Sequence, residues 1–86
     1  MKLTSGIMEV DLHGMTVEEA VRKARYMVAK APASVYTVRL IHGFHGGTKI
    51  KDAIENEFTH GNNKKVIRIK SGGNLGTTDL VLRELC

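Results

Sequence analysis

The stretch Met8-Glu9-Val10-Asp11-Leu12-His13-Gly14-Met15-Thr16-Val17-Glu18-Glu19 decides the fold, because one element of secondary structure ends within it and another begins. Before Gly14, apolar and polar residues alternate, which is typical of a half-buried strand because side chains on a strand switch faces with period two. After it, Thr16 and Glu19 form a capping box, in which each side chain accepts a hydrogen bond from the backbone N–H of the other. The stretch therefore predicts a strand over residues 7–13, a glycine turn and the start of a helix.

The rest of the chain continues with alternating patterns of helix and strand. Apolar residues at three- and four-residue spacing follow the capping box, and this stripe continues until Pro32 ends the helix. A second stripe, Ile50, Ile54 and Phe58, predicts another helix, which Gly61 stops. The predicted elements after the first strand are a helix over 17–31, a strand over 35–41, a helix over 50–60 and strands over 64–71 and 77–85.

This β-α-β-α-β-β order predicts an α/β protein of the α+β two-layer kind, formed as one domain over residues 1–86. Two amphipathic helices cannot cover both faces of four strands, and the strands alternate instead of being apolar throughout. We therefore expect a mixed four-stranded sheet with both helices on one face and the other face open. The crossover through the first helix makes the first two strands parallel.

Composition limits the compartment and the kind of partner. Lys and Arg outnumber Asp and Glu by 13 to 9, which gives a net charge of +4. This charge fits a polyanionic partner such as nucleic acid, although it also fits a domain charged for solubility alone. Cys86 is the one cysteine, so an internal disulfide is excluded, and no apolar run reaches the roughly 18 residues of a membrane span. We expect a cytoplasmic monomer with no membrane partner.

The predicted strands place cations on the open face of the sheet. Arg39 lies in the second strand, and Arg68 and Lys70 lie in the third, all at positions that alternate with apolar residues. Three cations on a wet face can hold a phosphate backbone, although the alternative is an ordinary solvated face. With two Tyr, two Phe and no Trp in the chain, reading of backbone or shape fits better than stacking on bases.

Asp11 and His13 lie on the same face of the first strand, directly before Gly14. A carboxylate at this spacing can orient an imidazole and leave the other ring nitrogen free for proton transfer. The helix N-terminus that follows favours an anion nearby. The alternative is that Asp11 is an exposed acid at the strand end and that His13 caps the turn.

Two glycine-rich segments follow later strands. The segment from His42 to Thr48 enters the second helix, and its glycines allow backbone N–H groups to approach a phosphate closely. The segment from Gly72 to Gly76 is either a third flexible backbone segment around a substrate, after those at Gly14 and at residues 42–48, or a flexible hairpin loop. The histidines and Cys86 lack a zinc-ligand spacing, so we predict no metal ligands. The phosphate-contact candidates of these segments are Gly43, Gly46, Gly47, Thr48, Gly72, Gly73 and Gly76.

Taken together, these segments resemble the Smr (small MutS-related) domain family over nearly the whole chain. The matching segments are Asp11-Leu12-His13-Gly14 with Glu19-Ala20 for the L-D-L-H-G opening, His42-Gly43 with the glycines at 46 and 47 for the H-G-x-G-x-G loop, and Gly72-Gly73 through Gly76-Thr77 for the late glycine-rich segment. The departures are Val10 for the first leucine, His45 where a glycine is expected, and Ile50-Lys51 where Leu-Arg often opens the second helix. Lys51 keeps the positive charge but lacks the planar fork of arginine.

The resemblance implies a fold like the C-terminal domain of translation initiation factor 3, a mixed four-stranded sheet whose last strand is antiparallel to the rest. It also implies an activity, because family members are DNA-nicking or RNA-cleaving endonucleases. The acid and histidine implicated in cleavage correspond to Asp11 and His13, and the histidine and glycine of the second motif correspond to His42 and Gly43. Gly14 and Lys51 join the residues expected at the phosphate.

The leading hypothesis is a nuclease module that acts on RNA or DNA, with His13 and His42 as general base and acid and Asp11 orienting His13. A variant that uses Mg²⁺ would take Asp11 and Glu9 as ligands, although two-metal nucleases usually need more acids. The alternatives are a non-catalytic nucleic-acid binder and a protein-interaction module in which the motifs are structural relics. These hypotheses differ in whether binding weakens with salt and whether a cleavage product forms.

Overall fold

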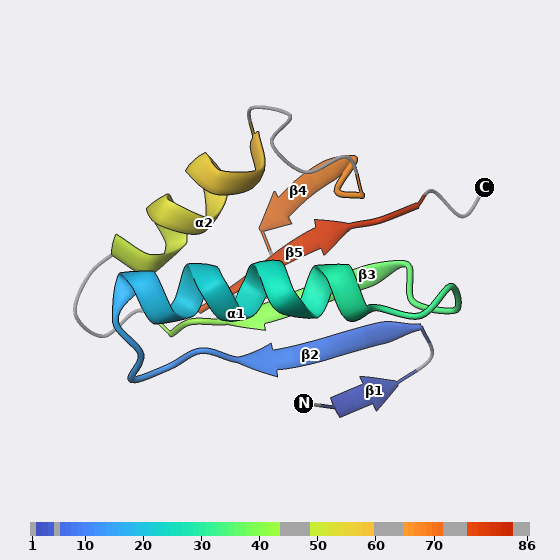
Figure 1. Cartoon of the computed structure of the whole chain (residues 1–86), viewed down its shortest axis with the longest axis horizontal. Helices are drawn as coiled ribbons and strands as arrows, with labels where there is room; N and C mark the ends of the chain where they lie inside the picture. The colour runs from blue at the N-terminus through green and yellow to red at the C-terminus, as the bar shows by residue number, and fades with distance from the viewer. Residues whose placement is uncertain (1, 5, 44–48, 60–64, 72–75, 84–86) are drawn as a thin grey trace.

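The computed structural model describes residues 2–4, 6–43, 49–59, 65–71 and 76–83 (Figure 1). Its elements in chain order are β1 (Lys2–Thr4), β2 (Ile7–Asp11), α1 (Val17–Lys30), β3 (Thr37–Ile41), α2 (Lys49–Thr59), β4 (Arg68–Ser71) and β5 (Thr77–Val81). The elements from β2 onward lie where the sequence predicts them, with boundaries shifted by a few residues. Neither helix of this described part is long and apolar enough to span a bilayer.

The strands form one mixed sheet in the order β1-β2-β3-β5-β4. β2 and β3 are parallel, and β5 lies between β3 and β4 and is antiparallel to both. The predicted mixed sheet, with its last strand antiparallel to the others, is therefore confirmed. β1 adds a short antiparallel strand beside β2 at the edge, which alternation does not predict because three residues are too few to show a period.

Both helices pack on the same face of the sheet, as predicted (Figure 1). Residues that are partners across β2, β3 and β5 share a face, so the register keeps one apolar set under the helices. The core side chains are Met8, Val10, Leu12, Ala20, Ala24, Met27, Val28, Val35, Val38, Leu40, Ile54, Phe58 and Leu80. Their removal from water stabilises the fold by roughly 25 cal/mol for each Å² of apolar surface. The opposite face, which carries Glu9, Asp11 and Arg39, is left open.

Side-chain contacts define both ends of α1. The predicted capping box is present, because the N–H of Glu19 donates to Oγ1 of Thr16 at 3.1 Å and the N–H of Thr16 donates to the Glu19 carboxylate at 3.0 Å. At the other end, Nζ of Lys65 donates to the carbonyl oxygen of Val28 at 2.8 Å. A cation at this position satisfies a terminal carbonyl and the negative end of the helix dipole.

Ile67, just before β4, is exposed although the sequence pattern predicts that it is buried. The sequence pattern places Ile67 and Ile69 inward, and Ile69 does pack against the core, but Ile67 is 52% exposed. The expectation for Ile67 is wrong because the regular alternation of β4 begins only at Arg68. Ile67 lies just outside it, where its N–H donates to the carbonyl oxygen of Val81 at 2.9 Å.

Among the glycines in the described ranges, Gly6, between β1 and β2, is the one whose replacement we expect to cost most. Its φ is +84°, and a Cβ there would lie 2.4 Å from the ring of Tyr36. Gly6→Ala is expected to lower the free energy of unfolding by about 3 kcal/mol, from left-handed strain plus overpacking, as measured by urea denaturation. Gly14→Ala is the control, because Gly14 has a φ of +79° but nothing within 4 Å of its Cβ position. It should cost only about 1–2 kcal/mol, and equal losses in the two variants would show that the Tyr36 ring moves aside freely.

Candidate functional site

The parallel pairing of β2 with β3 brings the predicted motifs to one edge of the sheet. Asp11 is the register partner of Ile41, and the N–H of Leu12 donates to the Ile41 carbonyl at 2.8 Å. The third segment also reaches this edge, because the carbonyl oxygen of Gly76 accepts from the N–H groups of His42 and Gly43, both at 2.9 Å. The three motifs, which are far apart in sequence, therefore meet where β2 and β3 end and β5 begins.

Asp11 and His13 form an exposed acid–imidazole pair at this edge. Nδ1 of His13 lies 2.5 Å from Oδ1 of Asp11, and the same oxygen accepts from the His13 backbone N–H at 3.0 Å. The side chain of His13 is 74% exposed. The hydrogen bonds from the His13 side chain and backbone hold the pKa of the Asp11 carboxyl below its usual value. Nε2 of His13 makes no hydrogen bond to another described residue, and it belongs to a largely exposed side chain.

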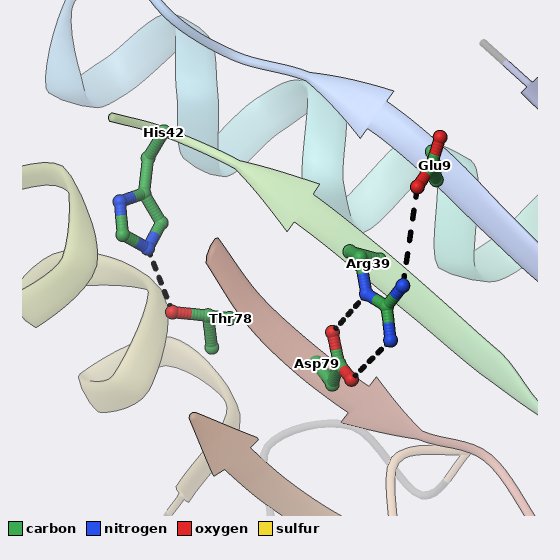
Figure 2. Close-up of polar contacts among 5 residues, drawn as sticks. All are labelled: Glu9, Arg39, His42, Thr78 and Asp79. Carbon is green, nitrogen blue, oxygen red and sulfur yellow. Dashed lines mark hydrogen bonds and ion pairs between the residues drawn. The ribbon is translucent and has the colours of Figure 1, made fainter. Parts of the chain in front are cut away.

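His42, in contrast, is buried beside β5 and α2 and is only 6% exposed (Figure 2). Its Nδ1 lies 2.8 Å from the carbonyl oxygen of Gly43, which can only accept, so Nδ1 donates. Its Nε2 lies 2.7 Å from Oγ1 of Thr78, and Figure 2 shows this contact beside α2. Both ring nitrogens hold the chain together, so the ring is not placed to exchange a proton with a substrate.

The two imidazoles lie on opposite faces of the sheet. The side chain of Asp11, which anchors His13, is on the open face. Thr78, which anchors His42, is the register partner of the core residue Leu40 and so faces the helices. The sequence places both histidines at one edge but does not show this separation, which removes the basis for the expected base-and-acid pair.

Only some of the residues whose backbone N–H groups are expected to bind a phosphate lie within the described ranges. Those of His42 and Gly43 are already bonded to Gly76, as given above. Gly14 and Gly43 have φ of +79° and +73°, so each turns the chain sharply after its strand. The remaining candidates Gly46, Gly47, Thr48, Gly72 and Gly73 lie outside the described residues.

Arg39 lies in the middle of the open face, bound by two acids (Figure 2). Its Nε and Nη2 donate to the two oxygens of Asp79 at 2.9 and 3.1 Å, and Nη1 lies 3.9 Å from a carboxylate oxygen of Glu9. The hydrogen bonds that Arg39 donates to the Asp79 carboxylate raise the pKa of Arg39 above its already high value. Because Asp79 is buried, this bidentate pair is fixed, and the charge of Arg39 is balanced before any phosphate arrives.

The other predicted cations lie away from the acid–histidine pair. Arg68 and Lys70 are exposed on β4, three strand spacings or about 14 Å from β2. On α2, Nζ of Lys51 lies 3.0 Å from a carboxylate oxygen of Glu55. Lys23, which no sequence pattern singles out, lies close enough to Asp11 to lower its pKa further, after the larger effect of His13. Its proximity depends on how α1 lies over β2, which a sequence pattern does not show.

Magnesium ligands are sparse in the described part of the chain. It contains no group of three or more His, Cys, Asp or Glu side chains that could hold a metal ion. Glu9, the second acid of the magnesium hypothesis, is oriented toward Arg39 instead of toward Asp11.

These features define a small α+β domain with a polar site at the ends of its parallel strands. The sequence model of the Smr domain matches residues 10–82, so the chain belongs to the Smr domain family. It is similar to the crystal structure of the Smr domain of Thermus thermophilus MutS2, with 32% identity, a TM-score of 0.76, and coverage of 90% of this chain and 99% of that one. No curated protein matches the chain. Smr domains generally bind nucleic acid, and some members have nuclease activity.

The different burial of the two histidines predicts different effects on stability. His42→Ala should lower the free energy of unfolding by about 2–4 kcal/mol, because it opens a cavity and leaves Thr78 and Gly43 without their partner. His13→Ala removes an exposed side chain and should change it by less than about 0.5 kcal/mol. Urea denaturation followed by circular dichroism measures both, and comparable losses in the two variants would contradict the assignment.

The Asp11 carboxyl provides a second test of the pair. His13→Ala should move the pKa of Asp11 upward, although the backbone hydrogen bond keeps it from recovering fully. Since the folded-state pKa is the lower one, the pair stabilises the fold above the unfolded pKa and this contribution is lost as pH falls through the folded pKa. Carboxyl ¹³C NMR titration measures the shift, and an unchanged Asp11 titration in the variant would mean that the two side chains do not interact in solution.

Proposed function

We propose that this chain is a nucleic-acid-cleaving Smr domain in which His13 is the general base and Asp11 is its positioning residue. The observation that carries the proposal is the geometry of the pair. Nδ1 of His13 is anchored to a carboxylate at 2.5 Å while the rest of the ring is exposed at the edge where three motifs meet. A carboxylate in this position fixes the tautomer and orientation of the ring and stabilises the imidazolium that forms.

On RNA, the pair would act through the sugar hydroxyl. Nε2 of His13 accepts the proton of the 2′-hydroxyl, and the 2′-oxygen forms a bond to the adjacent phosphorus. The bond from phosphorus to the 5′-oxygen then breaks, and that oxygen takes a proton from water. A positioned base contributes about 10²–10⁴-fold to such a step. On DNA, the same nitrogen would take the proton from an attacking water.

His42 has a positioning role in this proposal. Its ring joins the end of β3 to Thr78 of β5, and its backbone N–H helps to hold the Gly76 carbonyl. These contacts fix the edge on which the acid–histidine pair stands. His42→Ala would therefore lower activity through folding, whereas a variant of His13 would lower it with the fold intact.

The proposed phosphate contacts come from the turns at this edge, from the glycine segments and from cations farther away. Gly14 and Gly43 shape the two turns beside His13, and the glycine segments with Gly46, Gly47, Thr48, Gly72, Gly73 and Gly76 would supply further backbone contacts. Arg68 and Lys70 would hold the strand farther along, and Lys51 would add charge from α2. Arg39 would contribute little direct phosphate contact. Its ion pair with Asp79 would instead keep the open face of the sheet rigid. We also propose that the domain works as a cytoplasmic monomer.

A binding module without cleavage is the second candidate. The burial of His42 favours it, because only one of the two expected imidazoles is accessible to a substrate. Such a module would bind nucleic acid with strong salt dependence and release no product.

Asp11→Asn and His13→Ala are each expected to reduce cutting by about 10²-fold or more while leaving the fold and salt-dependent binding intact. The assay is incubation with labelled single-stranded RNA, duplex RNA and supercoiled DNA, with and without EDTA, followed by gel analysis. Glu18→Gln, an exposed charge change in the first turn of α1, is the matched control and should cut normally.

The outcomes separate the candidates. Wild-type cutting by both Asp11→Asn and His13→Ala would refute the assigned roles, and binding without product for the unmodified chain would favour the binding module. Loss of cutting in EDTA would indicate that a metal ion takes part.

A further inference from the structure

A groove runs along α1 and is lined mainly by residues of this helix, with Met8 of β2 on its other side. Figure 1 shows that β2 lies on the side of α1 away from α2. Its volume is about 910 Å³. Met15 and Met27 contribute to an apolar lining, and the exposed side chain of Tyr26 stands beside them. Arg22, Lys23 and Lys30 line the same groove, so an apolar surface is rimmed by cations.

The charge of the groove is unbalanced toward positive. Its three cations are accompanied by one acid, Glu19, whose carboxylate already accepts the N–H of Thr16 in the capping box. Residues three and four apart share one side of a helix, so the cations and Tyr26 form one stripe along α1. From Arg22 to Lys30 the stripe covers about 12 Å at 1.5 Å per residue. A chain with regularly spaced negative charges is the complementary ligand.

Tyr26 is the feature that selects among such ligands. It is 58% exposed, which leaves a large aromatic surface open to solvent, and Nζ of Lys30 lies 5.7 Å from the ring centre. An exposed aromatic ring among Lys and Arg side chains is typical of surfaces that stack unpaired bases and hold the phosphates between them. The scarcity of aromatic residues in the sequence argues against base stacking, but the structure places one of the two tyrosines where a base can reach it.

The groove is connected to the acid–histidine pair through the turn that follows β2, although neither Asp11 nor His13 lines it. Met15 follows the turn at Gly14, and its N–H donates to the Leu12 carbonyl at 3.2 Å. Lys23 lies on the groove and within electrostatic reach of Asp11, as described above. A strand that lies along α1 and continues past the turn at Gly14 would bring a later phosphate to the edge where His13 is exposed.

We propose that this groove binds an unpaired segment of the nucleic-acid substrate, with a base against Tyr26 and phosphates on Arg22, Lys23 and Lys30. The inference rests on the proposed function and adds that the preferred substrate is single-stranded next to the cleavage point. In a duplex the bases are stacked on one another, so a duplex would contact the groove only through its backbone. The apolar lining and Tyr26 would then make no contact with a base.

The test compares binding of fluorescein-labelled oligouridylate and of a blunt RNA duplex by the full chain, using fluorescence anisotropy. Tyr26→Ala should weaken binding of oligouridylate roughly tenfold and leave duplex binding unchanged, because a stacked base is lost. Tyr26→Phe keeps the ring and should bind normally.

Lys23→Gln and Lys30→Gln should each lower the slope of log affinity against log salt by about 0.7. Arg83→Gln, an exposed charge change two residues after β5, is the matched control and should bind as the unmodified chain does.

Other results would overturn the proposal. If Tyr26→Ala binds oligouridylate as the unmodified chain does, while Asp11→Asn still abolishes cutting, the groove assignment fails and the proposed function stands. If the chain binds neither nucleic acid, both fail. If an amphipathic peptide of alternating Leu and Glu binds with Tyr26-dependent affinity and oligouridylate does not, the groove is a protein-docking surface instead. Thermal melting of each variant confirms that the exposed substitutions leave the fold intact.

Discussion

The parallel pairing of β2 with β3 is the constraint on which the rest of the site depends. Because the carboxyl ends of parallel strands reach the same edge, the register of Asp11 with Ile41 places the two following turns side by side. The hydrogen bonds from His42 and Gly43 to Gly76 then attach the third motif to this edge. A shift of register by one residue would reverse every side chain on β2 and bury the Asp11 carboxylate under the helices.

The same alternation that builds the core separates the two histidines. His13 follows Asp11 on the open face and is exposed, whereas His42 lies under α2 with both ring nitrogens bonded. Two imidazoles that a sequence motif presents as equivalent therefore have different physical roles. One can meet a substrate, and the other stabilises the edge that holds the first.

Charge is distributed differently from what the composition indicates. On the open face, Arg39 lies between two acids, Glu9 and Asp79, so the centre of that face has no excess positive charge. The cations of α1 instead gather along one groove beside the acid–histidine pair. The net charge of +4 is therefore less informative than its placement, because a phosphate responds to the local excess of charge within about a Debye length.

Much of the fold follows from local sequence alone, because its signals act over a few residues. The capping box of Thr16 and Glu19, the strand alternation around Val10, and the stops at Gly14 and Pro32 all predict elements that the structure contains. The acid–histidine pair is equally local, since Asp11 and His13 are two residues apart. Only tertiary structure decided three other features: the burial of His42, the ion pair of Arg39 with Asp79, and the exposure of Tyr26 beside the groove. Each of these depends on partners from strands or helices distant in sequence, whose positions are set by packing and register and not by local propensity.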